Sequence, residues 1–365
     1  MLEKGKISAR QMGILMFPVI VATADLLLPA ITAKHAKQDM WISPILASVT
    51  GFLVVFIVYQ LNKSYPQETI IQYSRRIIGK IPGKILGFLF LSFLLHVNGL
   101  IIRQYGEFVV GNTLMYTPMP LVISSMLLIC GLVVRAGLEV LVRTAEIIVP
   151  VVILLWIVII ILLIPDMEVK HMFPIMEKGI MPSFIGAIPP MSWFTHFVLI
   201  SFFLPFVTDR KNGMKSGMIS VIIVMITLFM LNIATLFVFG GITATFTYPV
   251  MSASRYISIA DFFEHLESLV MAIWVASAFL KISAYYYALV LGTSQWLNLS
   301  DYRIIVFPLG ILLVFFSFWS LPNLQEMNDL FRVVPFNNMT FEMVIPLLLL
   351  LIHTIREKSG GNKKD

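Results

Sequence analysis

The chain has 365 residues, of which 58% are hydrophobic and only 13% are charged. Its mean hydropathy of +0.90 excludes a soluble globular protein, because this composition leaves too few polar groups to cover a water-exposed surface. The net charge of +6 is not gathered into basic clusters interleaved with aromatic residues, so no nucleic-acid binding is expected.

Apolar runs long enough to cross about 30 Å of hydrocarbon follow one another along the chain. They predict ten transmembrane helices, at approximately residues 11–31, 42–61, 85–110, 119–134, 141–164, 190–207, 214–239, 269–296, 304–321 and 339–355. The first run is too long for a signal-peptide core and no small-residue cleavage site follows it, so we expect it to be retained. Most of the 26 lysines and arginines fall on the N-terminal side of the membrane, which predicts that both termini are cytoplasmic.

Two connecting segments have a predicted structure of their own. Residues 68–80 form an amphipathic basic stretch that is expected to lie on the cytoplasmic headgroups. Residues 256–267, between the seventh and eighth spans, are expected to form a short surface helix. The only cysteine, Cys130, lies within the fourth span, where it is expected to be a small buried apolar residue.

The chain carries no motif of an enzyme. A Ser/His/Asp order, an HExxH or CxxC motif and a phosphate-binding glycine loop are all missing from the sequence. The sequence therefore predicts a protein without enzymatic activity, without a cofactor and without a metal site.

The first and sixth spans are predicted to be discontinuous, because prolines bracket the middle of each. Proline removes a backbone donor and clashes with the preceding turn. Interruptions at matching positions of two five-span halves are typical of inverted-repeat transporter folds, whose ligand site lies near the membrane midplane. We therefore expect one transmembrane domain over residues 1–365, with repeats at about 7–164 and 182–355. The bracketing prolines are Pro18 and Pro29 in the first span, and Pro189, Pro190 and Pro205 in the sixth.

Two charged residues lie where a membrane protein usually avoids them. Asp25 falls inside the first span and Lys281 at the centre of the eighth. An ionised group at this depth costs several kcal/mol unless it is paired or hydrated, so such residues usually line a cavity or a substrate path. Counting ~1.5 Å per residue places His96, Val97 and His196 near the midplane with Lys281, and Asp25 ~6 Å further outward.

Lys281 belongs to a polar stripe on the eighth span, because Ser277, Lys281 and Tyr285 recur every four residues. Two interpretations of Asp25 and Lys281 stay open. In the first, Asp25 and Lys281 lie beside a ligand pocket, and the Lys281 ammonium takes the place that a coupling sodium ion holds in related transport folds. In the second, the two residues form a structural ion pair that holds the two helices together. Arg103 and Glu107, four residues apart on the third span, are predicted to form a structural pair near the outer interface.

Several short motifs at matching spacing resemble those of one family. They support a resemblance, over almost the whole chain, to the GerAB-type B subunits of spore germinant receptors, within the amino acid–polyamine–organocation superfamily. The motifs are Leu28-Pro29, Arg103-x3-Glu107-x9-Thr117-Pro118, Leu204-Pro205, Tyr248-Pro249 with Glu264-x2-Glu267-Ser268 and Trp274, and Phe316-Ser-Phe-Trp319.

The resemblance implies a LeuT-like fold, residence in the inner membrane of the spore, and a complex with an A subunit and a lipoprotein C subunit. It also implies a small-molecule germinant, usually an amino acid. The implied pocket draws on Ala22, Thr23, Ala24 and Asp25 of the first span, Val97 of the third, His196 of the sixth, and Lys281 and Tyr285 of the eighth. This chain has alanines where the family often has glycines, and alanines keep a ligand carboxylate further from the backbone.

The function expected from the sequence is therefore sensing. A germinant binds between spans one, three, six and eight and favours one conformation of the bundle, which signals to the A and C subunits. A proton-coupled amino-acid permease is the first alternative, because a sensor and a permease share one fold. A scaffold that holds the partner subunits, with a vestigial pocket, is the second.

Overall fold

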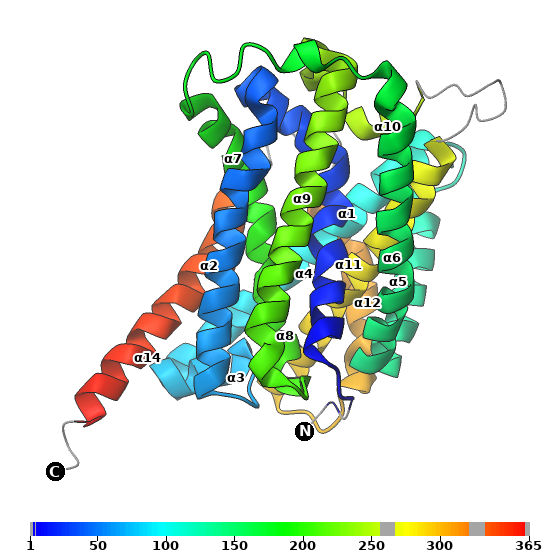
Figure 1. Cartoon of the computed structure of the whole chain (residues 1–365). Helices are drawn as coiled ribbons and strands as arrows, with labels where there is room; N and C mark the ends of the chain where they lie inside the picture. The colour runs from blue at the N-terminus through cyan, green and yellow to red at the C-terminus, as the bar shows by residue number, and fades with distance from the viewer. Residues whose placement is uncertain (1–2, 4, 256–266, 321–332, 362–365) are drawn as a thin grey trace.

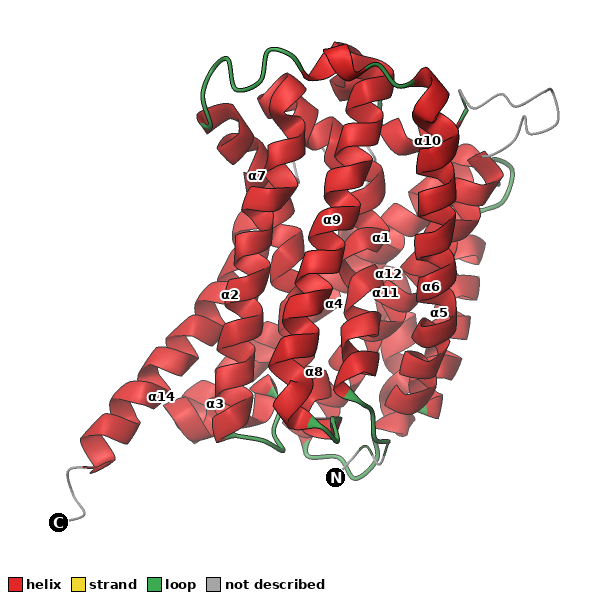
Figure 2. Ribbon diagram, in the orientation of Figure 1, coloured by secondary structure: helices red, strands yellow, loops and turns green. Residues whose placement is uncertain are grey.

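The computed structural model describes residues 3, 5–255, 267–320 and 333–361. This part of the chain is a bundle of long helices that run between two opposite faces (Figure 1), and Figure 2 shows helices joined by short loops. The surface helix expected at 256–267 lies outside the described residues, except for its last position. The first helix begins and the last helix ends at the same face, called here the N-terminal face (Figure 1).

Nine segments of the described chain are long and apolar enough to span a membrane. The first of them, Ala9–Ser64, is 56 residues long and folds back on itself, so it contributes two crossings. The ten spans predicted from the sequence are thereby confirmed. The helices are α1 Ala9–Ala36, α2 Ser43–Ser64, α3 Ile70–Ile78, α4 Lys80–Asn112, α5 Met119–Ala136, α6 Leu138–Leu163, α7 Met181–Phe194, α8 Ile200–Phe203, α9 Gly213–Phe239, α10 Pro249–Ser254, α11 Glu267–Leu297, α12 Val306–Ser320 and α14 Ile345–Gly361.

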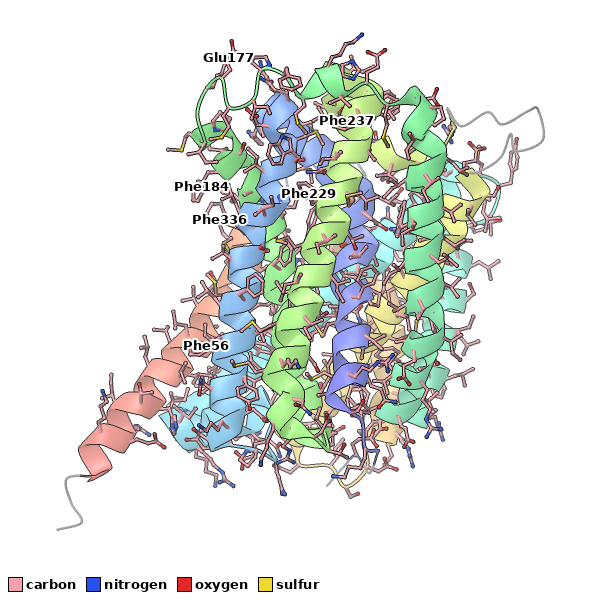
Figure 3. All side chains as sticks on the ribbon, in the orientation of Figure 1. Phe56, Glu177, Phe184, Phe229, Phe237 and Phe336 are labelled. Carbon is pink, nitrogen blue, oxygen red and sulfur yellow. The ribbon has the colours of Figure 1, made fainter. Side chains whose placement is uncertain are left out.

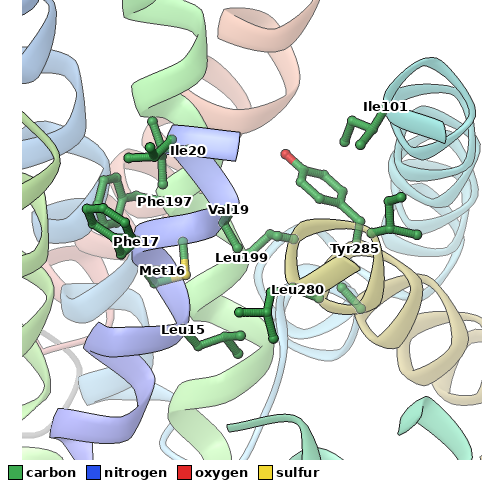
Figure 4. Close-up of a cluster of buried hydrophobic side chains, with 14 of the residues drawn as sticks. Leu15, Met16, Phe17, Val19, Ile20, Ile101, Phe197, Leu199, Leu280 and Tyr285 are labelled. Atoms are coloured by element: carbon green, nitrogen blue, oxygen red, sulfur yellow. The ribbon is translucent and has the colours of Figure 1, made fainter. Parts of the chain in front are cut away.

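The core surrounds α1, which packs against α6, α7, α9 and α11. A capping box formed by Ser8 and Gln11 begins this helix by satisfying backbone donors at its first turn. Most of its side chains are buried in the protein, whereas Phe56, Phe184 and Phe336 are exposed and lie on the outer surface of the bundle (Figure 3). Apolar side chains on that surface are suited to contact lipid. Figure 4 shows part of the core, including Leu15, Met16, Phe17, Val19, Ile20, Ile101, Phe197, Leu199, Leu280 and Tyr285.

The sixth span is broken as predicted. It begins as α7, changes to a 3-10 helix over Thr195–Leu199, returns briefly to α8, and ends in a second 3-10 turn, Leu204–Phe206. Pro189 and Pro190 cannot donate backbone hydrogen bonds within α7, and a 3-10 stretch inside a helix commonly marks a functional hinge.

The first span differs from the expectation, because α1 is helical from Ala9 to Ala36 with both Pro18 and Pro29 inside it. Each proline removes only one backbone hydrogen bond, and the helices packed around α1 keep it in shape. The local irregularity is at Asp25, whose Oδ1 accepts a hydrogen bond from the backbone N–H of Leu26 (2.8 Å). Pro29, four residues further on, cannot donate to the Asp25 carbonyl, so this segment still has incompletely bonded backbone groups.

The N-terminal segment before α1 packs against the N-terminal face of the bundle. Ile7 forms an isolated parallel bridge with Val207, which follows the broken span. The buried Glu3 carboxylate accepts hydrogen bonds from the Tyr302 hydroxyl (3.0 Å) and the Leu138 backbone N–H (3.1 Å). These contacts tie the start of the chain to both halves of the bundle.

The amphipathic stretch after α2 forms α3, which packs against the first turns of α4. The two helices meet so closely at Gly83 that a β-carbon there would lie 2.4 Å from the Arg75 Cα atom. Only glycine fits such a contact between two backbones.

We expect Gly83→Ala to destabilise the protein by about 1–3 kcal/mol, because the backbone must shift to admit the methyl group. Thermal unfolding of the purified protein in detergent measures the effect. Gly111→Ala is the matched control, since Gly111 also lies in α4 and a β-carbon there meets nothing within 4 Å. Equal unfolding temperatures for the two variants would contradict the close contact.

Candidate functional site

Lys281 is fully buried in α11 and is bound to α1. Its Nζ atom donates a hydrogen bond to the Thr23 hydroxyl (2.7 Å). Asp25, also fully buried, accepts from the Leu26 backbone through Oδ1, whereas its Oδ2 has no hydrogen-bond partner among the described residues. No ion pair within 4 Å joins Lys281 to Asp25 in the described part of the chain. Thr23 is therefore the partner of the lysine, and one Asp25 oxygen is left without a donor.

A second buried group, Glu342, organises the polar centre of the bundle. Its Oε2 atom accepts a hydrogen bond from the Thr195 hydroxyl (2.6 Å) and lies 2.7 Å from His196 Nδ1. The Tyr285 hydroxyl donates to Glu342 Oε1 (3.1 Å). The Glu342 cluster, as we call Glu342, Thr195, His196 and Tyr285, joins the sixth, eighth and tenth spans through one carboxylate.

The break in the sixth span positions two members of this cluster. Thr195 and His196 open the 3-10 helix that follows α7, and this segment contacts both α11 and the Thr340–Val344 turn. That turn is a π-helix, in which one extra residue per turn shifts the side chains that follow. Irregular helices on both sides thus bring a histidine and a carboxylate together, and π-turns of this kind are frequent at functional sites.

The sequence reasoning missed Glu342, although the signal was the same one that selected Asp25 and Lys281. The residue lies in the tenth apolar run but close to its start, which suggests an interfacial position. In the described chain this helical segment starts at residue 333, so Glu342 lies ~14 Å along it. Asn98 was also missed: it is fully buried in α4, and neither polar atom of its side chain has a partner among the described residues.

The remaining predicted site residues have simpler surroundings. Ala22 and Ala24 are fully buried in α1 on either side of Thr23, and Val97 is buried in the apolar core. His96 Nδ1 lies 3.4 Å from the Ser320 hydroxyl of α12. His96 thus packs against α12, whereas His196 belongs to the Glu342 cluster.

Arg103 and Glu107 lie in contact at the entrance to the site. Arg103 Nη2 is 2.8 Å from Glu107 Oε1, and the guanidinium lies 5.1 Å from the centre of the Phe318 ring. Glu107 and Tyr248 line a cavity of about 360 Å³ at the face opposite the N-terminal face. The same two residues line a smaller cavity of about 10 Å³ that reaches Thr23, enough for about one water molecule.

A polar cavity of about 400 Å³ opens at the N-terminal face, lined in part by Gln72, Phe206 and Gln295. Fully buried Phe202 and Phe203 of α8 belong to the core near this face. The arrangement places the lysine and the Glu342 cluster in the closed middle of a bundle that has a polar opening at each end. Among the described residues, no three histidine, cysteine or acidic side chains are grouped to hold a metal ion.

The ten crossings, the broken sixth span and the buried polar centre define a multi-pass membrane protein with the LeuT-like transporter fold. Two solved structures share this fold. One is the substrate-bound outward-open state of a Na⁺-coupled sialic acid symporter, with a TM-score of 0.66 and 14% identity over 93% of this chain and 80% of the symporter. The other is MhsT in complex with L-phenylalanine, with a TM-score of 0.65 and 11% identity over 96% of this chain and 89% of MhsT.

The chain belongs to the family of spore germination proteins, whose family model matches residues 6–325. Spore germination protein KB of Bacillus subtilis (strain 168) is 26% identical, covering 99% of each chain. Spore germination protein YndE of the same organism is 28% identical, covering 97% of this chain and 98% of YndE. Spore germination protein XB of Bacillus anthracis is 26% identical over 68% of this chain and 70% of its own. The relatives are described as germination proteins and the sialic acid protein as a symporter, and none of them is described as an enzyme.

Proposed function

We propose that this protein is the germinant-binding membrane subunit of a spore germination receptor. It binds a small nutrient, an amino acid in the first instance, between α1, α4, the broken sixth span and α11. Binding favours one conformation of the bundle, which signals to an A subunit and a C subunit. Both termini lie in the cytoplasm and the protein resides in the inner membrane of the spore. The two repeats are residues 7–164 and 182–355 of one domain.

The observation that carries this proposal is the concentration of buried ionisable groups on helices that pack together in the middle of the bundle. Asp25, Lys281 and Glu342 are all fully buried at membrane depth, where such groups are costly and usually functional. Packing alone could be achieved with apolar side chains of similar volume, often at no loss of stability. The unbonded Asp25 Oδ2 and the two unbonded polar atoms of Asn98 further support a polar ligand or water in this region.

The charges suggest how an amino acid is held. The ligand amine pairs with the unbonded Oδ2 oxygen of Asp25, and the ligand carboxylate pairs with the Lys281 ammonium. In this structure that ammonium donates a hydrogen bond to the Thr23 hydroxyl instead. The cavity that reaches Thr23 holds only about one water in this structure, so ligand entry requires movement of residues beside Glu107 and Tyr248. MhsT, a protein of this fold, was solved in complex with L-phenylalanine, which agrees with an amino acid as ligand.

A proton-coupled amino-acid permease is the second candidate. It is favoured by the two polar openings at opposite ends of the bundle and by the transport function named for the sialic acid symporter. In that case the site alternates between the two openings, and Lys281 or Asp25 exchanges a proton. The Arg103–Glu107 contact keeps its proposed structural role in both cases.

Retention of radiolabelled L-amino acids, sugars and nucleosides by proteoliposomes separates the two candidates. Label that remains bound after the lipid is permeabilised, and that is lost in Lys281→Met, is the expected result for a sensor. Label that escapes on permeabilisation was accumulated in the lumen and would establish the permease. Retention that is equal in protein-free liposomes would leave neither function supported for this chain.

A further inference from the structure

A groove on the outer surface of the bundle lies apart from the site described above. It has a volume of about 280 Å³ and lies where α1 is flanked by α6 and α9, helices that Figure 1 shows on either side of α1. Its lining includes Arg10, Phe17, Ile153, Ser216, Ser220 and Ile223.

The polar and apolar parts of the groove are separated along its length. Arg10, Gly13 and Ser216 come from the first turns of α1 and α9, which both begin at the N-terminal face. Phe17, Ile153 and Ile223 lie deeper along their helices and form an apolar channel. The groove is therefore charged at the membrane surface and apolar toward the membrane interior, as a phospholipid is.

The charged end is free to bind an anion. Arg10 is exposed, and among the described residues no carboxylate lies within 4 Å of its guanidinium. On the neighbouring α6 the Glu146 carboxylate is engaged by the Gln11 side-chain amide (2.9 Å). A guanidinium binds phosphate oxygens in a bidentate manner, and a basic residue at the membrane surface attracts anionic lipids.

The shape of the groove is held by close helix contact. A β-carbon on Gly13 would lie 3.0 Å from the Ser216 carbonyl oxygen, and the Ser220 hydroxyl donates to the Gly13 carbonyl (2.9 Å). These contacts fix α1 against α9 and leave the space on the α6 side open. The groove volume of about 280 Å³ is many times the ~10–15 Å³ that one water needs, so the groove has room for several waters or for an acyl segment. Its apolar lining favours the acyl segment.

We propose that this groove is a binding site for one anionic phospholipid. The phosphate is held by Arg10 at the N-terminal face, and one acyl chain lies between α1, α6 and α9. Because α1 also carries Thr23 and Asp25, a lipid at this position contacts the same helix that contributes to the polar centre of the bundle.

The test is lipid retention by the purified full-length chain, measured by native mass spectrometry. The protein is delipidated and then incubated with equal amounts of phosphatidylglycerol and phosphatidylcholine that carry the same acyl chains. We expect the wild type to retain phosphatidylglycerol preferentially, and Arg10→Gln to lower that retention about fivefold. Arg10→Lys keeps the charge and should preserve the preference.

Two further variants test the groove itself. Ile153→Trp fills the apolar channel and is expected to lower the retention of both lipids. Lys80→Gln removes one positive charge from an exposed residue at the start of α4, outside the groove, and is expected to behave as the wild type. Equal retention of the two lipids by the wild type, unchanged retention in Arg10→Gln, or unchanged retention in Ile153→Trp would each overturn the proposal.

Discussion

The Glu342→Leu variant is expected to unfold at a markedly lower temperature than the wild type and to abolish the germination response. Its carboxylate is the shared acceptor for Thr195, His196 and Tyr285. Leucine therefore leaves His196 Nδ1 and the Tyr285 hydroxyl without this buried partner at once, whereas Thr195 keeps its bond to the Ser192 carbonyl. Removing one member of a buried charged network costs about 3–5 kcal/mol. Thermal unfolding in detergent and germination of spores that carry the variant measure the two effects.

Glu357→Leu is the matched control, because Glu357 lies near the C-terminal end of the same span and is exposed to solvent. An exposed substitution of this kind changes stability by about 0.5 kcal/mol or less. Glu342→Gln keeps one carboxamide oxygen as acceptor and should give an intermediate loss. A Glu342→Leu protein as stable as the Glu357→Leu protein would contradict the role of Glu342 as the centre of the cluster.

Lys281→Met is expected to weaken the response to the germinant by at least about tenfold while the protein stays folded. Methionine approximates the length of the lysine side chain, and the substitution removes one hydrogen bond, the one that Lys281 donates to the Thr23 hydroxyl. A bound carboxylate, by contrast, would lose the buried Lys281 ammonium as its partner, which typically costs more than the 1.4 kcal/mol of a tenfold change. The measurement is the dose response of spore germination across the proteinogenic L-amino acids.

Ser277→Ala is the control for Lys281→Met. Ser277 lies one turn away on the same face of α11 and is equally buried, but its hydroxyl has no partner among the described residues. Its loss should leave both the fold and the dose response unchanged. A folded Lys281→Met protein with the wild-type dose response would show that the lysine is structural. An unfolded one would support the interpretation of Lys281 as a helix-joining residue.

The spans were predictable because a helix that crosses lipid must be long and apolar, and this requirement is local in sequence. The ten crossings, the buried position of Cys130 and the break in the sixth span all follow from composition and proline placement. The continuity of α1 does not follow. Pro18 and Pro29 predict an interruption, and only the packing of four helices around α1 decides that it stays helical.

The polar centre was only half predictable. Charge at membrane depth singled out Asp25 and Lys281, and the same argument applies to Glu342, which was overlooked near the start of its apolar run. Which groups bond to which could not be predicted, since Thr23 is 258 residues from Lys281, and His196 is 146 residues from Glu342. Such pairings depend on how the helices pack and on the 3-10 and π turns that rotate single side chains.

By itself, then, the sequence determined that this is a multi-pass membrane protein with its ionisable residues at membrane depth, because the bilayer imposes that pattern on each helix separately. The tertiary structure decided that the Thr23 hydroxyl accepts a hydrogen bond from the Lys281 ammonium, that Glu342 joins three spans, and that a groove on the outer surface runs beside α1. These features depend on distances between helices far apart in the chain. Such distances are set by side-chain packing across the whole bundle and not by any local pattern.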